Sequence, residues 1–293
     1  MSFFQPAPGT VLSHDIADYP DGIVLPIDKP WRWTSADVIR KVKFAAFRHF
    51  RKKNLKVGHA GTLDPLATGV LLVCLGPACK RAQEFQDHDK EYVAGIRFGA
   101  TTPSYDLEKE VDRTFPYDQV TEGAVRAVLP SFLGPQEQVA PLFSAKSVDG
   151  VRAYEMARKL YHNAQKGILD PDFDAAALET LHRSRITISD LEMLEYVAAS
   201  AVPSRTPDAA CSQADVISAS SRINVADTAS LGLPEAKIRI ACSKGTYIRA
   251  FARDLGEALG TGAHLSSLVR TKTGAFRLED ALSLEEALAL LAD

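Results

Sequence analysis

The chain has 293 residues, of which 46% are hydrophobic and 24% are charged, a composition that allows one large or two ordinary globular domains with a sizeable core. No apolar stretch reaches membrane-spanning length, and the first twenty residues lack the basic start and apolar block of a signal peptide, so we expect a cytoplasmic protein without membrane contact. The cysteines at 74, 79, 211 and 242 have no neighbours that would complete a zinc site, and we expect free thiols in a reducing cytosol.

The net charge of −3 conceals an uneven distribution of charge along the chain. Residues 29–56 carry ten Lys or Arg against one acid, and residues 237–277 carry eight against two. Segregated positive charge of this kind can form a phosphate-binding surface even on an acidic protein. It is equally typical of solvated helix faces on proteins that bind no polyanion, so charge alone leaves both interpretations open.

The first 22 residues contain three prolines and predict an irregular N-terminal extension, followed by a short apolar strand at 23–27. A helix is predicted from Thr34 or Ser35 to about Phe50, because either hydroxyl can cap a helix and Asp37 suits its positive end. The helix has a basic face and one apolar stripe, formed by Val38, Ile39, Val42, Ala46 and Phe50.

Residues 57–69 are suited to holding one carboxylate in place. The glycines at 58 and 61 permit backbone angles that side chains forbid, and they let another molecule approach the main chain. Pro65 keeps Asp64 out of the helical region, so we expect Asp64 in an extended or turn conformation. An apolar strand at 70–75 follows, and a constrained loop beside a core strand often carries catalytic side chains. An isolated Asp-Pro is more often a simple turn.

Helices and strands are predicted to alternate through the rest of the chain. Tyr92 falls on the apolar face of a predicted strand, where the pattern alone favours a core aromatic. Residues 198–235 are rich in Ala and Ser without a sustained period, and they predict a flexible insertion. The remaining predicted elements are helices at 78–88, 120–129, after Tyr247 and at 284–291, and strands at 90–99, 183–188 and 236–242.

The stretch from Gly58 to Gly69, GHAGTLDPLATG, resembles the catalytic signature of the TruB family of tRNA pseudouridine synthases. Twelve consecutive matching residues make this a specific resemblance. Further segments that resemble motifs of that family are DKPWRWTS at 28–35, KEY at 90–92, KGTYIR at 244–249 and the closing segment at 264–276.

The chain also departs from the family pattern at several positions. Arg32 stands where the family usually has Gly, which affects the expected turn geometry rather than the chemistry. The segment at 143–158 resembles a further motif of the family, in which Phe143 stands in place of a Tyr. In the turn at 101–106, Thr102, Ser104 and Asp106 fit the family pattern. Pro103 replaces an acid there, and we therefore assign this turn no chemical role.

The resemblance implies roles for single residues. Asp64 would be the essential catalytic residue, and Arg249 would pair with it and keep it charged through bidentate hydrogen bonds. Tyr92 would lie against the target base and help to transfer a proton. The substrate-binding residues would be Lys29, His59, Gly61 and Leu268, although a turn-stabilising role for His59 is equally open.

The fold that the resemblance implies is α/β (α+β), namely the pseudouridine synthase fold, with a mixed, mostly antiparallel central sheet flanked by helices around a central catalytic cleft. The catalytic domain would span 23–281 and contain the insertion at about 198–235. A short helix within 282–293 would stand where many family members carry an RNA-binding PUA domain. A mobile element that folds over the bound RNA would lie near 155–182.

The activity that the resemblance implies is conversion of the T-loop uridine (position 55) of tRNA to pseudouridine by a monomer that needs no cofactor and no metal. The uridine would be flipped out of its stack, and Asp64 would act as nucleophile, by attack at C1′ or through a glycal. Two other classes of protein are alternatives to this activity. An inactive RNA-binding protein is disfavoured by the presence of Asp64, Tyr92 and Arg249. A metal-dependent phosphoesterase using Asp64 and His59 would need more acids and histidines nearby.

Overall fold

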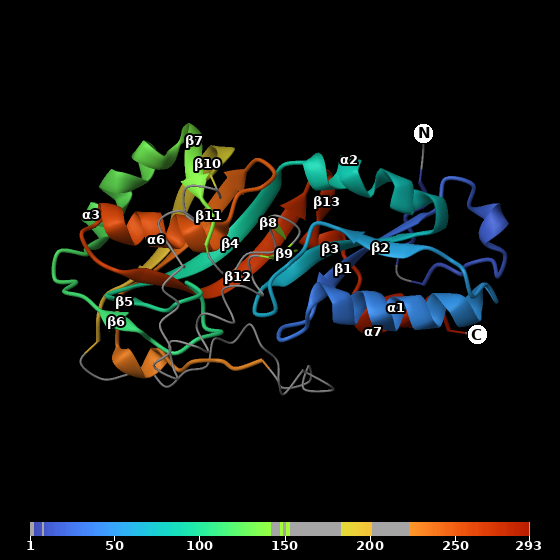
Figure 1. Cartoon of the computed structure of the whole chain (residues 1–293), viewed down its shortest axis with the longest axis horizontal. Helices are drawn as coiled ribbons and strands as arrows, with labels where there is room; N and C mark the ends of the chain where they lie inside the picture. The colour runs from blue at the N-terminus through green and yellow to red at the C-terminus, as the bar shows by residue number, and fades with distance from the viewer. Residues whose placement is uncertain are drawn as a thin grey trace.

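The structure is a computed structural model that describes residues 3–7, 9–141, 147–148, 151–152, 183–200 and 223–292. Its main feature is a nine-stranded sheet in the order β1–β3–β12–β4–β11–β10–β7, with β2 beside β3 and β13 beside β12 (Figure 1). The strands are β1 (Ile23–Lys29), β2 (Val57–Ala60), β3 (Thr68–Leu75), β4 (Lys90–Phe98), β7 (Gly134–Val139), β10 (Arg183–Val197), β11 (Glu235–Cys242), β12 (Ala263–Thr273) and β13 (Phe276–Arg277). Two separate hairpins are formed by β5 (Ala100–Thr101) with β6 (Arg113–Thr114), and by β8 (Ser147–Val148) with β9 (Val151–Arg152).

One parallel junction joins the two halves of the sheet. β3 runs parallel to β12, where Thr68 pairs with Val269 and Gly69 pairs with Arg270. The other junctions of this sheet are antiparallel among the strands that the structure describes. The loop at 61–67 comes immediately before β3, so this junction sets the loop against β12. The predicted mixed, mostly antiparallel sheet is confirmed.

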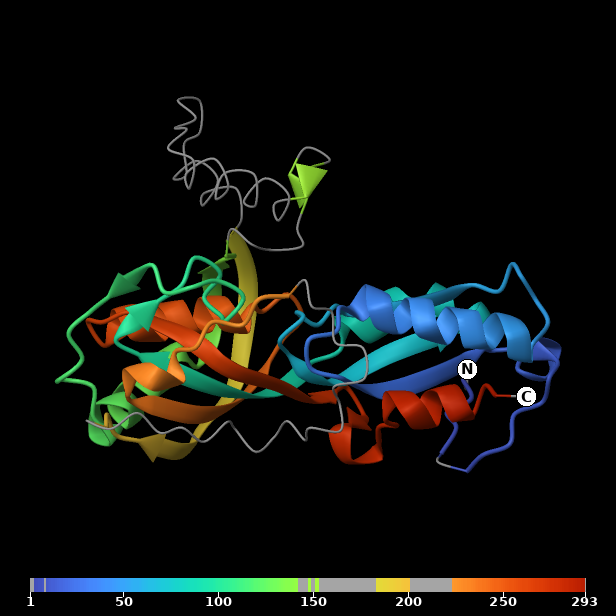
Figure 2. The same cartoon turned by 90° about the horizontal axis from the view of Figure 1, so that it is seen from below.

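Helices cover the sheet on both sides of this junction. They are α1 (Ser35–His49), α2 (Ala82–Asp87), α3 (Glu122–Val128), α6 (Ile248–Ala258) and α7 (Leu284–Ala289). α1 and α6 lie on the same side of the sheet, where α1 packs beside β2 and α6 packs on β12 and β4, and α7 lies near α1 (Figure 2). The β3–β12 junction therefore lies between α1 and α6.

The start of α1 agrees with the prediction. The hydroxyl of Thr34 accepts a hydrogen bond from the N–H of Asp37 at 3.0 Å, and the Asp37 carboxylate accepts one from the N–H of Thr34 at 3.1 Å. This reciprocal capping box satisfies backbone donors that the first turn of a helix leaves unpaired. Val38, Val42 and Ala46 are fully buried along the inner face, as the apolar stripe predicted.

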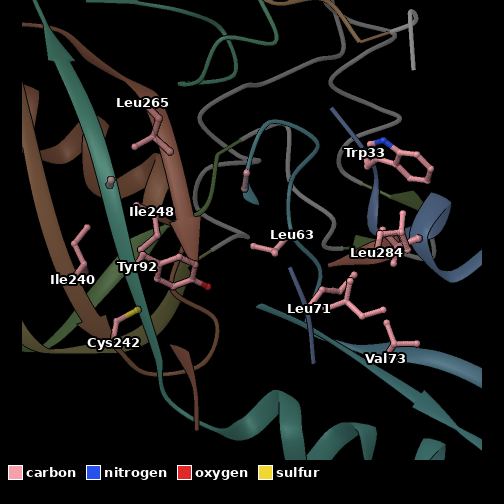
Figure 3. Close-up of a cluster of buried hydrophobic side chains, with 14 of the residues drawn as sticks. Trp33, Leu63, Leu71, Val73, Tyr92, Ile240, Cys242, Ile248, Leu265 and Leu284 are labelled. Atoms are coloured by element: carbon pink, nitrogen blue, oxygen red, sulfur yellow. The ribbon is translucent and has the colours of Figure 1, made fainter. Parts of the chain in front are cut away.

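A single apolar cluster spans the junction and fixes the two halves of the sheet relative to each other. In Figure 3, Leu63 from the 61–67 loop lies between the two groups of side chains. The labelled members are Tyr92, Ile240, Cys242, Ile248 and Leu265 on one side, and Trp33, Leu71, Val73 and Leu284 on the other.

The strand predicted at 183–188 is longer than expected. β10 runs from Arg183 to Val197, pairing with β7 over its first part and with β11 over most of its length. Its register on β11 shifts between Ile188 and Asp190 and again between Met193 and Glu195. Each irregularity interrupts the two-residue alternation of buried and exposed side chains, which is why the sequence pattern ended too early.

The flexible insertion predicted at 198–235 needs correction over part of its length. Residues 223–234 pack on the sheet, with Ile223, Ala226 and Thr228 buried. The Thr228 hydroxyl accepts a hydrogen bond from Arg97 at 2.9 Å and lies 3.1 Å from Nε2 of His264. Residues that are held by polar contacts produce no periodic hydrophobic pattern, so the sequence did not indicate that this part of the insertion is packed. Residues 201–222 lie outside the described residues, as does the predicted mobile element at 155–182.

Candidate active site

Asp64 lies in the 61–67 loop in a non-helical conformation, as Pro65 predicted. Ser35 at the start of α1 holds the preceding residue from both sides. Its hydroxyl accepts the N–H of Leu63 at 2.9 Å and donates to the Leu63 carbonyl at 3.1 Å. The side chain of Leu63 is buried in the core, so the residue next to Asp64 is fixed by both its backbone and its side chain.

Arg270 of β12 holds the start of the same loop and the strand β3 that follows it. This buried guanidinium donates to the carbonyls of Gly61 at 3.0 Å, Thr62 at 3.4 Å and Val70 at 2.7 Å. Carbonyl oxygens of a tight loop have few other partners when they face the protein interior, and a guanidinium satisfies several at once. The sequence analysis assigned Arg270 no role, because the sequence alone does not distinguish a buried arginine from an exposed one.

Arg249, in the first turn of α6, holds the Asp64 carboxylate with two parallel hydrogen bonds. Its Nε donates to Oδ2 at 3.0 Å and its Nη2 donates to Oδ1 at 3.2 Å. The Arg249 side chain is 5% exposed, whereas that of Asp64 is 38% exposed. A guanidinium fixed from inside thus presents a partly open carboxylate in a defined direction.

Asp106 lies on the inner side of the same guanidinium. Its Oδ2 is 3.7 Å from Nε of Arg249, and Nη1 of Arg249 donates to the carbonyl of Ser104 at 3.1 Å. Burial raises the pKa of Asp106, although Arg249 opposes the shift. Burial disfavours charge on Arg249, but attraction by Asp64, Asp106 and Glu108 outweighs it and raises the pKa.

The turn at 101–106, to which the sequence analysis assigned no chemical role, places the Asp106 carboxylate beside Arg249. The Ser104 hydroxyl donates to the Asp106 carboxylate at 2.6 Å, and the N–H of Glu108 donates to the same oxygen at 2.9 Å. The turn thus presents one carboxylate to Arg249. The sequence did contain a signal for Asp106, because Thr102, Ser104 and Asp106 match the family turn. The replacement of an acid by Pro103 led the sequence analysis to set this match aside.

A cavity of about 290 Å³ opens beside the Asp64–Arg249 pair. Leu268 of β12 lines it, as do Asp106 and Trp31. The other lining residues are Leu66, Ala67, Thr68, Arg97, Leu107, Val225, Ala226, Asp227, Thr228, Ala229, Leu265, Ser266, Ser267 and Val269. The site therefore combines one oriented carboxylate with a wall that is mostly apolar, which suits binding of a flat organic group next to a nucleophile.

Comparison with known proteins identifies the chain by two regions. Residues 48–167 match the TruB family pseudouridylate synthase (N terminal domain), and residues 249–293 match the tRNA pseudouridylate synthase B C-terminal domain. A protein of Phocaeicola vulgatus named tRNA pseudouridine synthase B is 44% identical over 92% of this chain and 92% of its own length. One of Bacteroides thetaiotaomicron with the same name is 45% identical over the same shares of both chains. The chain belongs to the TruB family of pseudouridine synthases.

Solved structures support the fold of this TruB family chain. A chain of "Crystal Structure of a Cbf5-Nop10-Gar1 Complex" is 24% identical and matches with a TM-score of 0.54, over 92% of this chain and 54% of that one. A chain of "Structure of H/ACA RNP bound to a substrate RNA containing 2'-deoxyuridine" is 23% identical with a TM-score of 0.52. The TruB family chain thus spans about half the length of these structural relatives.

The residues predicted from the TruB family resemblance are not all found at the cavity. Asp64, Arg249 and Leu268 share it. Tyr92 is buried in β4 and is not among the lining residues. Burial raises the pKa of Tyr92, so its phenol is neutral near physiological pH. In Figure 3 its hydroxyl points toward the space between the two halves of the core.

Lys29 was predicted to bind substrate, but the structure gives it an internal position. It is fully buried, and its ammonium donates to the carbonyls of Trp33 at 2.6 Å, Pro30 at 2.9 Å and Pro65 at 3.2 Å. These bonds use all three N–H groups. Burial lowers the pKa of Lys29 to about 7, with Asp64 opposing. Lys29 therefore supports the turn after Asp64 rather than facing the cavity.

His59 and Gly61 lie at the start of the loop, outside the cavity lining. His59 is half-buried in β2, and burial together with Arg270 lowers its pKa. Gly61 has φ 89°, a value that favours glycine, and its carbonyl is one of the Arg270 acceptors. The described part of the chain contains no group of three or more His, Cys, Asp or Glu that could hold a metal ion. None of its helices is long and apolar enough to cross a membrane.

Proposed function

We propose that this protein isomerises the T-loop uridine (position 55) of tRNA to pseudouridine, with Asp64 as the nucleophile and Arg249 as the residue that orients it. The two parallel hydrogen bonds from Arg249 to Asp64 at the edge of a mostly apolar cavity carry the proposal. The relatives at 44% and 45% identity bear the name tRNA pseudouridine synthase B, which supports tRNA as the substrate.

The reaction breaks the bond between C1′ and N1 of the uridine and forms a bond between C1′ and C5. The C5 proton is lost and N1 gains a proton, so the balance needs no oxidant, phosphate donor or metal. Asp64 would either attack C1′ or take the C2′ proton in an elimination that forms a glycal, and the freed uracil would turn within the cavity. Its wall, which includes Leu268, Leu265 and Val225, would keep water away from this intermediate.

Each polar side chain of the site has a separate task in this mechanism. Arg249 orients the Asp64 carboxylate, and Asp106 balances the guanidinium from the buried side. Tyr92 is assigned to contact the uracil and to help relay the proton that leaves C5, because a phenol hydroxyl can both accept and donate a hydrogen bond. The uridine reaches the cavity only when it is flipped out of the T loop.

The partner in this proposal is the T arm of tRNA, bound by a monomer in the cytoplasm. The catalytic domain would lie within 23–281. The exposed basic face of α1 would contact phosphates, since this helix lies on the same side of the sheet as α6 and begins at the residue that holds Leu63.

Tritium release from tRNA labelled at uracil C5 tests the proposal. Wild-type protein should release tritium in the presence of EDTA, because no step requires a metal. Asp64→Asn should still bind tRNA but release none, since an amide is not a nucleophile at C1′. Absence of release by wild-type protein that binds the labelled tRNA would refute the proposed function. Release that EDTA abolishes would point instead to metal-dependent chemistry.

A further inference from the structure

One wall of the catalytic cavity is formed by part of a segment at residues 223–229, which leads into the short 3-10 helix Ala229–Leu231. This 223–229 segment is drawn in orange below β12 in Figure 1. Residues 225–229 line the cavity together with Asp64 and Arg249. Because the segment has no regular secondary structure over 223–228, the position of this wall depends on individual anchors.

Three of these anchors lie on the side of β4, β12 and the 101–112 loop. The N–H of Ala226 donates to the carbonyl of Leu107 at 2.8 Å. Thr228 is held between Arg97 and the buried His264. Asn224 donates from its side-chain amide to the Glu110 carboxylate at 3.0 Å.

A fourth anchor comes from the opposite half of the sheet. Arg32, in the turn between β1 and α1, donates from Nη2 to the carbonyl of Ile223 at 2.8 Å. Its guanidinium carbon lies 5.6 Å from the centre of the Trp31 ring, and Trp31 itself lines the cavity. The hydrogen bond connects residues 191 positions apart and links the 223–229 segment to the half of the sheet that carries Asp64.

The conformation of Arg32 is unfavourable in two respects. Its φ is 61°, in the left-handed region that residues with a Cβ rarely adopt and that glycine adopts without strain. Its Nε is buried and has no hydrogen-bond partner among the described residues. The contacts that offset these penalties are the hydrogen bond to Ile223 and the stacking on Trp31. A glycine would relieve the strain and lose both contacts.

We propose that Arg32 is a positioning residue that fastens the 223–229 segment across the catalytic cavity, and so orders the wall against which the flipped uridine is held. This inference rests on the proposed function, because the wall matters only if a base enters the cavity. Arg32 itself would touch no reacting atom. A displacement of about 1 Å in a positioning group can reduce a rate by up to about 100-fold, whereas tRNA affinity depends mainly on phosphate contacts elsewhere.

A matched pair of variants separates the tether from the strain. Arg32→Ala keeps the Cβ and loses the guanidinium, whereas Arg32→Gly loses the guanidinium and relieves the strain. Both should reduce the single-turnover rate of pseudouridine formation by about tenfold, with less than about a twofold change in Kd for tRNA. Arg32→Lys should recover part of the rate because it restores a donor. Arg126→Ala, on the exposed face of α3, should leave the rate unchanged.

Hydrogen exchange gives a second readout that a catalytic effect alone would not change. Amides of residues 223–229, including the Ala226 N–H, should exchange faster in Arg32→Ala and Arg32→Gly than in wild-type protein. If Arg32→Gly is as active as wild type, or if its activity falls without faster exchange, the proposal is overturned. If wild-type protein makes no pseudouridine, the proposed function fails separately. In that case hydrogen exchange still tests the role of Arg32. Faster exchange of residues 223–229 in the Arg32 variants would support it, and unchanged exchange would overturn it.

Discussion

Arg249 and Asp64 are 185 positions apart in sequence and are joined by two hydrogen bonds of 3.0 and 3.2 Å. The geometry is side-on, so Arg249 fixes the direction of the carboxylate and also places a positive charge beside it. A lysine at position 249 could supply the charge without the direction. The pair therefore allows orientation and charge to be tested separately.

We predict that Arg249→Lys lowers the single-turnover rate of pseudouridine formation by about 100-fold or more, because a single ammonium cannot hold both carboxylate oxygens in one plane. Kd for tRNA should change little, as Arg249 is buried. Arg253→Lys, one turn further along α6, is the control, since its guanidinium contacts Val139 and Asp254 instead. Equal rates for wild type and Arg249→Lys would show that orientation by Arg249 is unimportant.

Arg270 should matter for stability as well as for activity. Arg270→Met would leave the carbonyls of Gly61, Thr62 and Val70 without their donor, and we expect the free energy of unfolding to fall by about 3 kcal/mol. Arg277→Met, at an exposed position of β13, should change it by less than about 0.5 kcal/mol. Urea denaturation of the two variants provides the comparison. A similar small effect for both would mean that the loop does not depend on Arg270.

Substitution by alanine should have very different effects at two glycines of the catalytic stretch. Gly69 has φ 97°, and a Cβ there would lie 2.2 Å from the carbonyl oxygen of Arg270. A Cβ at Gly58 would meet nothing within 4 Å. We expect Gly69→Ala to destabilise the protein by at least about 2 kcal/mol, and Gly58→Ala to be nearly neutral. Melting temperatures test this, and equal melting temperatures for the two variants would contradict it.

His264 should make stability depend on pH. Burial lowers its pKa from 6.5 to about 4, although the bond to the Ala100 carbonyl opposes the shift. Below pH 6.5 His264 therefore binds a proton in the unfolded chain, whereas in the folded protein it remains neutral down to about pH 4. The free energy of unfolding should fall as pH decreases through this range, by about 2 kcal/mol at pH 5 from this group. Denaturation of His264→Gln at pH 7.5 and 5 should lack this component, and an unchanged pH dependence would contradict the assignment.

The basic face of α1 leads to a prediction about salt. Lys41 and Lys43 are exposed on this helix. If they contact phosphates, Lys41→Gln with Lys43→Gln should weaken tRNA binding and reduce the slope of log affinity against log salt by about 1 to 2. Arg126→Gln on α3 serves as the control. An unchanged slope would favour the alternative that this face is only solvated.

The sequence alone predicted features that depend on neighbouring residues. Thr34 and Asp37 indicated the start of α1, and Pro65 indicated a non-helical Asp64, because caps and prolines act within a few residues. Pairing of Asp64 with Arg249 came from the family resemblance, since no local rule connects residues so far apart.

What the sequence did not predict depends on long-range contacts. Asp106 lies beside Arg249, which is distant in sequence, and Arg270 binds backbone carbonyls of the 61–67 loop and of β3. Lys29 resembles a substrate-binding cation in sequence, but three carbonyls surround it in the interior. Polar groups that are buried by their partners carry no hydrophobic period, so pattern analysis places them on the surface.

The most direct test of the central claim is to map pseudouridine in unmodified tRNA after incubation with wild-type protein and with Asp64→Asn. The account predicts one new pseudouridine, at the T-loop uridine, with wild-type protein. It predicts none with Asp64→Asn, which should bind the same tRNA with similar affinity. Pseudouridine formation by Asp64→Asn, or modification at a different position by wild-type protein, would contradict the account.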